Sequence, residues 1–211
     1  KRLQAEIKLL EASTSSIPIQ KQQIRSKLCD ELGITLSRVP FAGELIEVRP
    51  EHGEWAGAAN RLLGGFATTL LVHEDDYRKI AGWVDRNQLR DKWSYIVVPV
   101  AHAGGSDRTD DRSIVRVLDV QTHAYRSWVM AHLARNFNYD RVDTIAELMK
   151  SEYRITKAGQ IRHAGKRHEK DDRRDISDKR FWVLGDNREK LHRFREDPAS
   201  IAVELDAATK E

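Results

Sequence analysis

Apolar residues recur every three or four positions at both ends of the chain. Leu3, Ile7 and Leu10 form the first stripe, and a further helix is predicted at 19–32 before Gly33 ends it. The stripe near the other end passes through Asn187, Leu191, Phe194, Pro198, Ile201, Leu205 and Ala208. Steps of four and three residues are the heptad pattern of coiled coils. Because proline interrupts a helix, one helix should stop near Glu196 and another should restart at Pro198 in the same register.

The two stripes predict a helical arm at each end of the chain, residues 1–33 and 186–211. The economical arrangement is an antiparallel coiled-coil hairpin, with a globular domain of residues 34–185 inserted at its tip. Two independent terminal helices that fold back onto the domain are the alternative. Since the sequence starts at Lys1 within the helical pattern, we expect it to be a piece of a longer protein.

Between the arms, short β-branched runs alternate with amphipathic stretches. The first part is predicted to hold strands at 44–48, 68–72 and 95–100, with helices at 54–63 and 76–89. A Gly/Asp-rich loop at 102–112 follows. Beyond it we predict helices at 124–137 and 144–151, a strand at 139–142, a hairpin at 153–163 and a strand at 181–184. This order predicts an α/β domain of two similar halves, about 41–100 and 113–184.

Two adjacent glycines, Gly64 and Gly65, stand between a predicted helix and a predicted strand. A glycine just past a helix is a common cap, because the left-handed conformation costs it nothing. One glycine would be enough for that purpose. The second lets another backbone come close, and that backbone need not belong to the same chain. A plain helix-to-strand turn is the simpler alternative.

Composition narrows the range of functions. The 211 residues suffice for one domain with appendages, and a net charge of +3 does not by itself indicate a nucleic-acid-binding protein. The single cysteine, Cys29, cannot form a disulfide within the chain and favours a reducing compartment, the cytoplasm. No apolar run reaches the roughly 18 residues that a membrane-spanning helix needs, so no membrane partner is expected.

Patterns for catalysis and metal binding are weak. The chain has no Gly-x-x-x-x-Gly-Lys-Ser/Thr motif, and no Ser/His/Asp or Cys/His set can be argued. The run "HEDD" at 73–76 could hold a metal ion, but carboxylates at the start of a helix usually cap it. Two cations lie between His163 and His168, which disfavours a metal there. We therefore predict no catalytic residues, no metal site and no cofactor in this part of the protein.

One segment is strongly basic. Residues 154–174 hold eight lysines and arginines against three acids. The eight cations are Arg154, Lys157, Arg162, Lys166, Arg167, Lys170, Arg173 and Arg174. Long cationic side chains on a hairpin and loop suit contact with DNA phosphates, and no aromatic residue interleaves them to read bases. A solvated loop whose charges pair with one another is the alternative.

Together these features resemble the hinge domain of SMC proteins, chromosome-organising ATPases whose long coiled coil folds back on itself at the hinge. "FAGELIEVRPEHGEWAGAANRLLGGFATTLLVHEDDYRKI" is similar to the first half of such a hinge, and "RVDTIAELMK" with "YRITKAGQIRHAG" to its second half. The run "GQIRHAGKRHEKDDR" followed by "VLGDNREKL" resembles the MukB-like branch, in particular the SMC subunits of MksB and Wadjet (JetC) systems. The resemblance spans about residues 40–191.

Several expectations come from this resemblance. It implies the hinge dimerisation domain of a bacterial SMC-like condensin, active in chromosome organisation or Wadjet-type plasmid defence, that forms a homodimer. The implied dimer contacts are Gly64, Gly65, Phe66, Gly159 and Gly165. ATP and Mg²⁺ would bind at heads elsewhere in the full-length protein. DNA, a kleisin and accessory subunits would be further partners, and the protein would lie in the cytoplasm on the nucleoid or on plasmids.

Other interpretations remain. The chain could be a sequence-nonspecific DNA-binding module without a dimer role, or a metal-dependent nuclease that uses Glu74, Asp75 and Asp76. SMC hinges end their second half with a Gly-Gly pair where this chain has only Gly165. This departure leaves open whether a dimer would form a closed ring.

Overall fold

The computed structural model describes residues 2–100 and 109–196. The helices of this part are α1 (Arg2–Glu11), α2 (Ile19–Leu32), α3 (Ala56–Ala67), α4 (Tyr77–Arg86), α5 (Arg126–Asn136), α6 (Ile145–Leu148) and α7 (Arg188–Arg195). The strands are β1 (Ile46–Val48), β2 (Leu70–His73), β3 (Tyr95–Val98), β4 (Leu118–Val120), β5 (Asp140–Val142), β6 (Arg154–Thr156), β7 (Ile161–Arg162) and β8 (His168–Glu169).

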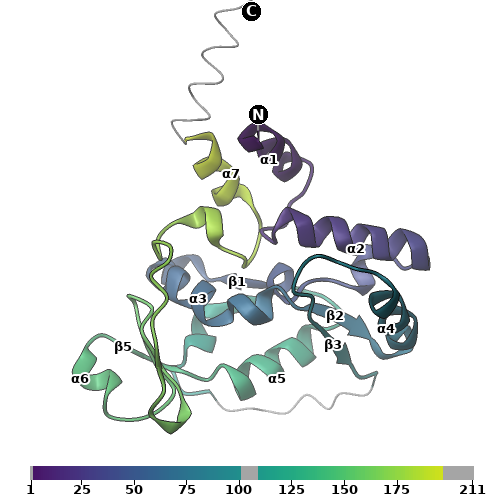
Figure 1. Cartoon of the computed structure of the whole chain (residues 1–211). Coiled ribbons are helices and arrows are strands. Elements are labelled where there is room, and N and C mark those ends of the chain that lie inside the picture. The colour runs from purple at the N-terminus through teal and green to yellow at the C-terminus, as the bar shows by residue number, and fades with distance from the viewer. Residues whose placement is uncertain (1, 101–108, 197–211) are drawn as a thin grey trace, which may run out of the picture.

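The strands of the described residues form three small sheets (Figure 1). β1 pairs antiparallel with β4, which ties the two predicted halves together. β2 and β3 are parallel, with Leu70 opposite Tyr95. In the third sheet β5 and β6 are parallel, and β7 and β8 follow antiparallel at its other side. The predicted α/β class is confirmed, but the halves differ, because one contributes a two-stranded sheet and the other a four-stranded one.

Two hydrophobic clusters hold these short elements together. The smaller cluster packs α2 and α4 beside β2 and includes Phe41 and Leu70. The larger one joins α3, α5 and strands of both halves, and includes Leu63, Val129 and Ile155. All five side chains are fully buried, and each such burial contributes about 1.5–3 kcal/mol. The larger cluster therefore draws on side chains of both halves, which pack into one core.

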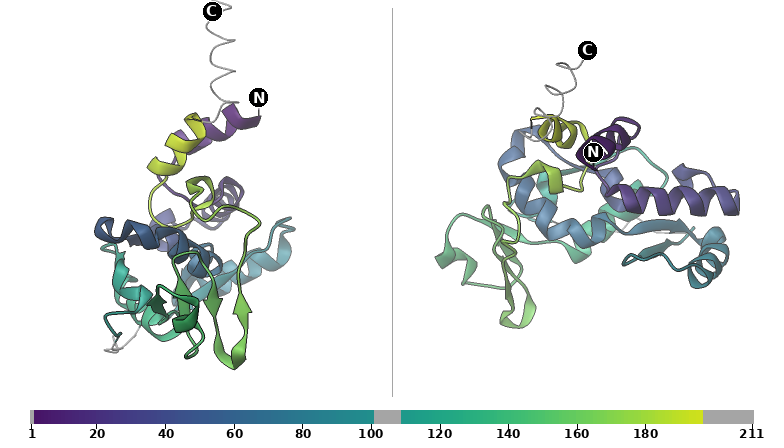
Figure 2. Two further views of the ribbon diagram at one scale, coloured as in Figure 1. Left: turned by 90° about the vertical axis from the view of Figure 1, so that its left-hand side faces the viewer. Right: turned by 45° about the horizontal axis from the view of Figure 1, so that its top comes forward.

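The first and last helices of the described part, α1 and α7, lie side by side. The chain enters through α1 and leaves through α7 on the same side of the molecule (Figures 1 and 2). The amide of Asn187 donates to the carbonyls of Leu10 (2.7 Å) and Ser13 (2.6 Å), and Arg195 pairs with Glu11 at 2.6 Å. The prediction that the two ends pack against each other is confirmed for α1 and α7. The restart at Pro198 and the side chain of Leu3 lie outside the described part.

The helix predicted at 19–32 has the same bounds in the structure, α2, and ends as expected at Gly33. That glycine has φ +64°, the left-handed conformation that favours glycine, and its N–H donates to the carbonyl of Cys29. Apolar spacing and one glycine were sufficient to define this helix.

The cap predicted at Gly64 and Gly65 is wrong. α3 continues through both glycines to Ala67. The hydroxyl of Thr68 donates to the carbonyl of Gly64 at 3.1 Å, and that of Thr69 to the carbonyl of Gly65 at 2.9 Å. These two side chains satisfy carbonyls of the last turn, so the helix ends without a glycine cap.

The strand predicted at 181–184 is also wrong. Phe181 ends a short 3₁₀ turn, and the backbone N–H groups of Val183 (2.7 Å) and Leu184 (3.1 Å) donate to the side-chain oxygen of Asn60. A buried amide on α3 therefore takes the place of a neighbouring strand. The strand predicted at 44–48 begins only at Ile46, because Ala42–Leu45 forms a 3₁₀ turn.

Candidate functional site

Residues 170–185 connect β8 to α7 and cross one face of α3; we call them the strap. Gly57 gives the strap room, since a Cβ there would lie 2.5 Å from the carbonyl oxygen of Ile176. One turn further along, Asn60 holds the end of the strap through the two bonds described above. Arg61 donates to the carbonyl of Arg174 at 3.0 Å. The segment that leads out to α7 thus packs closely on α3 at Gly57 and is hydrogen-bonded to it at Asn60 and Arg61.

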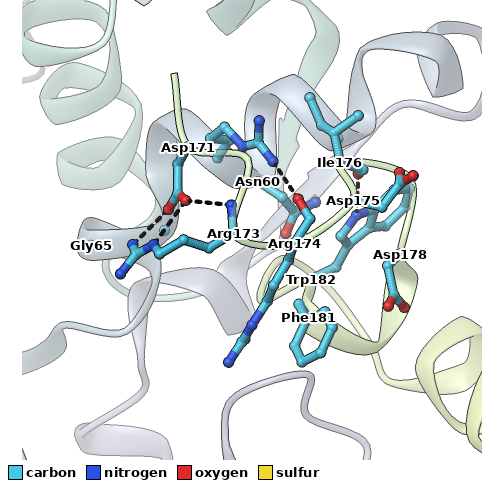
Figure 3. Close-up of a pocket in the computed structure, with 13 residues that line it drawn as sticks. Asn60, Gly65, Asp171, Arg173, Arg174, Asp175, Ile176, Asp178, Phe181 and Trp182 are labelled. Carbon is cyan, nitrogen blue, oxygen red and sulfur yellow. Dashed lines mark hydrogen bonds and ion pairs between the residues drawn. The ribbon is translucent and has the colours of Figure 1, made fainter. Parts of the chain in front are cut away.

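A cavity of about 570 Å³ lies between α3 and the strap (Figure 3). Gly64 and Gly65 line it, and a Cβ at either would meet nothing within 4 Å. On the strap, the carboxylate of Asp171 accepts hydrogen bonds from the side chain and backbone of Arg173, which holds the pKa of Asp171 well below its ordinary value. Arg174 lies 3.7 Å from the ring centre of Phe181. Because neither glycine has a side chain, α3 faces the cavity with its backbone at this point. On the other side of the cavity, the acidic and basic side chains of the strap largely balance one another.

Two of the predicted dimer contacts face their own chain. Gly159 has φ +75°, and a Cβ there would lie 2.6 Å from the Cδ1 of Ile176, so this glycine makes room for the strap. The ring of Phe66 is 7% exposed and stacks on His132 with centroids 4.5 Å apart. Burial lowers the pKa of His132, with a smaller effect from Arg135, so the neutral ring is favoured in this stack. Little of Phe66 is left to meet a partner.

Gly165 lies at the tip of the hairpin that joins β7 and β8. Gly165 (φ +65°) and Lys166 (φ +62°) are both left-handed, as a tight hairpin turn requires. The N–H of Gly165 donates to the carboxylate of Glu152 at 2.9 Å, and a Cβ on the glycine would meet nothing within 4 Å. Gly165 is therefore exposed at the end of the four-stranded sheet.

Each half of the domain ends in an open strand edge. Among the described residues, β3 pairs only with β2, and β8 pairs only with β7. In Figure 1, β3 lies toward the right, and the light-green hairpin that contains β8 lies toward the lower left. A row of unpaired N–H and C=O groups is a template for pairing with another chain.

Exposed apolar side chains occur in both halves of the domain. Val100, two residues after β3, is 62% exposed, and the exposed ring of Tyr77 lies 6.3 Å from that of Tyr95 in β3. At the other end Ile145, Met149 and Tyr153 are about half exposed or more, on α6 and just before β6. Each half of the described part therefore exposes apolar side chains, at β3 in one half and around α6 and β6 in the other.

The basic run is mostly paired within the chain. Lys157 pairs with Asp143 at 3.5 Å, Arg167 with Glu169 at 2.8 Å, Lys170 with Asp172 at 2.9 Å and Arg173 with Asp171 at 2.6 Å. Arg154 donates to the carbonyl of Glu147, and Arg162 to those of Leu148 and Met149, so both hold the end of α6. Among the described residues, only Lys166 and Arg174 of the eight have neither a carboxylate within 4.0 Å nor a carbonyl partner for the side chain.

Contact with DNA should accordingly be weak. With two phosphates engaged by Lys166 and Arg174, log affinity for duplex DNA should fall with log salt concentration at a slope of about −1.8, against about −7 for all eight cations. Fluorescence anisotropy over a salt series measures the slope. The variant K166Q/R174Q should lose most of the binding that the basic run contributes. The control R167Q/K170Q removes the same charge from cations that already pair with carboxylates, and it should keep most of the DNA binding. A slope near −7 would contradict this account.

The acidic run at 73–76 has structural partners. The ring of His73 accepts from the N–H of Asp75 at 3.3 Å, and Asp76 pairs with Arg38 at 2.7 Å. Glu74 accepts from the backbone of Val100 at 2.7 Å. Within residues 2–100 and 109–196, no group of three His, Cys, Asp or Glu side chains could hold a metal ion, and no helix is long and apolar enough to cross a membrane.

Comparison with solved structures decides the fold. The extended hinge of the Pyrococcus furiosus Smc protein, which carries a coiled coil, matches 98% of this chain over 71% of its own length, at 16% identity and a TM-score of 0.51. The Geobacillus stearothermophilus SMC hinge domain, solved as an asymmetric dimer, matches 99% over 86% of its length, at 18% identity and a TM-score of 0.54. The chain has the fold of an SMC hinge domain.

A third solved structure is also similar. The folded elbow of cohesin matches 99% of this chain at 15% identity and a TM-score of 0.58, and the chain spans 30% of that protein's length. No protein-family model matches the sequence. No curated protein sequence matches it either. The likeness therefore lies in the hinge fold, and the residues that act in it have to be argued from this chain's own geometry.

Sequence reasoning missed two features of the site. The first is Asn60, which is 8% exposed and holds the strap but which the sequence analysis did not name as a functional residue. The signal was a polar residue on the apolar face formed by Ala59 and Leu63. The open edges were missed because an edge depends on which strands pair, and a single strand's sequence does not show its neighbours.

Proposed function

We propose that this chain is a dimerisation hinge in which two copies join through their open strand edges. The observation that carries the proposal is the pair of open edges, β3 in one half and β8 in the other. Both halves also expose apolar side chains, beside β3 and around α6 and β6. Strand addition at an open edge is a common way for chains to associate. The hinge fold supports the proposal, since the similar Geobacillus domain was solved as an asymmetric dimer.

In the proposed dimer, β3 of one copy pairs with β8 of the other, and a two-fold axis repeats the contact. Each copy then uses both edges once, so the assembly closes as a ring without open ends. Val100 and Tyr77 would face Met149 and Tyr153 of the other copy, and these apolar surfaces would leave water together. Gly165 would let the partner strand approach the hairpin tip, because it has no side chain there.

The paired ends α1 and α7 extend the proposal to the whole protein. We infer a hinge at the fold of a bacterial SMC-like condensin of the MukB-like branch, MksB or Wadjet (JetC). Its heads would bind ATP and Mg²⁺, kleisin and accessory subunits would join it, and it would act on nucleoid or plasmid DNA in the cytoplasm. The weak DNA contact at Lys166 and Arg174 belongs to this proposal. Hundreds of residues of heptad sequence on both sides of this segment in its parent gene would support it.

Light scattering coupled to size exclusion tests the dimer. At micromolar concentration the mass should be twice the chain's 24.3 kDa, and it should fall toward 24.3 kDa on dilution. That Gly64 and Gly65 contact the partner stays a prediction, and the self-association of a Gly65→Ala variant tests it. A mass of 24.3 kDa at all concentrations would contradict the hinge proposal and favour a DNA-binding module without a dimer role.

A further inference from the structure

A second basic group lies away from the strap. A cavity of about 350 Å³ between β5, α6 and β6 is lined by five cationic side chains: Arg112, Arg141, Lys150, Arg154 and Lys157. Two carboxylates, those of Asp143 and Glu147, also line it, along with Trp55 and Val142. Five positive charges minus two negative charges leave the lining with a net formal charge of +3.

The two carboxylates already have partners. Glu147 accepts from the backbone N–H groups of Asp143 (3.2 Å) and Thr144 (3.3 Å), which lowers its pKa and caps the start of α6. Asp143 pairs with Lys157 at 3.5 Å. Asp143 thus balances one lining cation, Lys157, and the charge of Lys150 contributes a smaller part of the lowered pKa of Glu147. Among the described residues, neither acid forms an ion pair with Arg112, Arg141, Lys150 or Arg154.

Those remaining cations have little negative charge near them. Arg112 and Arg154 each have one carboxylate at 3.9 Å, the outer limit of an ion pair. Arg141 and Lys150 have none within 4.0 Å in the described part of the chain. The cavity thus gathers positive charge that the protein itself leaves unbalanced.

Neutral groups fix the guanidinium groups in place. Arg141 donates to the carbonyls of Arg112 (3.1 Å) and Asp111 (2.6 Å), and Arg154 donates to that of Glu147. The Nε of Arg154 is buried without a hydrogen-bond partner among the described residues. Carbonyl partners orient an arginine without cancelling its charge, so the cavity presents ordered cationic donors, which bind oxyanions well.

We propose that this cavity binds an anion of linked phosphate groups, through the phosphates alone. Its volume lies near the lower end of the range for small-molecule sites. Trp55 is 4% exposed, and Arg141 and Lys157 lie 5.6 and 5.4 Å from its ring centre. The ring face is therefore already covered, and a base cannot stack on it. The site goes beyond the proposed hinge function, since the dimer edges do not require it.

Calorimetric titration with inorganic tripolyphosphate tests the site. The variant R112Q/K150Q removes two exposed cations and should weaken binding about tenfold or more, because each removes a charge-assisted contact. R78Q/K79Q removes one arginine and one lysine from the exposed face of α4 and serves as the matched control, which should bind as the unmodified chain does. Thermal melting of both variants checks the fold.

Competition with a short DNA duplex separates the two sources of phosphate. If the duplex displaces tripolyphosphate and R112Q/K150Q weakens both, the natural ligand is a nucleic-acid backbone; without displacement it is a small free anion. Either result supports a phosphate site. Equal tripolyphosphate binding by R112Q/K150Q and R78Q/K79Q, or equally strong binding of sulfate at the same concentration, would overturn it.

Discussion

Replacing Gly57 with alanine should destabilise the fold by about 1–3 kcal/mol, the usual cost of overpacking. The new Cβ would lie 2.5 Å from the carbonyl oxygen of Ile176 and 2.8 Å from its Cγ1. The strap cannot move away freely, because its end is held on Asn60. Urea unfolding of the variant and the unmodified chain, at equal concentration, measures the difference.

The same substitution at Gly65 is the matched control on the same helix. A Cβ there meets nothing within 4 Å, and alanine is favoured over glycine inside a helix by about 0.5–1 kcal/mol. The protomer should therefore become slightly more stable. Weaker self-association of Gly65→Ala would place this glycine in the dimer contact, as the family resemblance implies. If Gly57→Ala proved as stable as Gly65→Ala, the strap would not be fixed on α3 as described.

Replacing Val97 with proline should weaken self-association on the order of 100-fold. The N–H of Leu70 donates to the carbonyl of Ser94 at 3.0 Å, so in a parallel ladder Ile96 and Val98 face β2 and Val97 points its N–H outward. Proline removes that donor at the open edge and leaves the bonds to β2 in place.

Val97→Thr is the control, since threonine keeps both the N–H and the β-branched shape. Sedimentation velocity gives the dimer affinity of each variant, and circular dichroism checks that both are folded. A folded Val97→Pro variant that self-associates as strongly as Val97→Thr would exclude the β3 edge from the contact.

Local signals in the sequence predicted much of the fold. The helix at 19–32 was defined by its apolar spacing and Gly33, and the hairpin of β6 and β7 by its alternating strands. The two errors arose where side chains replaced the expected local partner. Thr68 and Thr69 end α3 in place of a glycine, and Asn60 binds the backbone of a segment more than 120 residues away, which no local pattern shows.

The basic run shows why counting charges was insufficient. In Asp171-x-Arg173, the carboxylate accepts from both the side chain and the backbone of the arginine two residues on. The same arrangement recurs at 178–180 and 186–188. Asp-x-Arg spacing could have been read from the sequence as a sign of internal pairing. The cavity lined by Arg112 and Arg141 could not, because β5 and α6 have to fold before its cations come together.

Cysteine cross-linking between two copies tests the edge-to-edge hinge most directly. One copy carries Val97→Cys and a differently tagged copy carries His168→Cys, since residues opposite each other on paired strands have Cβ atoms about 4.5–5.5 Å apart. The native Cys29 is 5% exposed and burial raises the pKa of its thiol, so it should not form a disulfide in this experiment. We expect a disulfide between the two copies, and none when Val97→Cys is mixed with Lys79→Cys. Absence of a disulfide between the Val97→Cys copy and the His168→Cys copy, at concentrations where the chain is dimeric, would contradict the account.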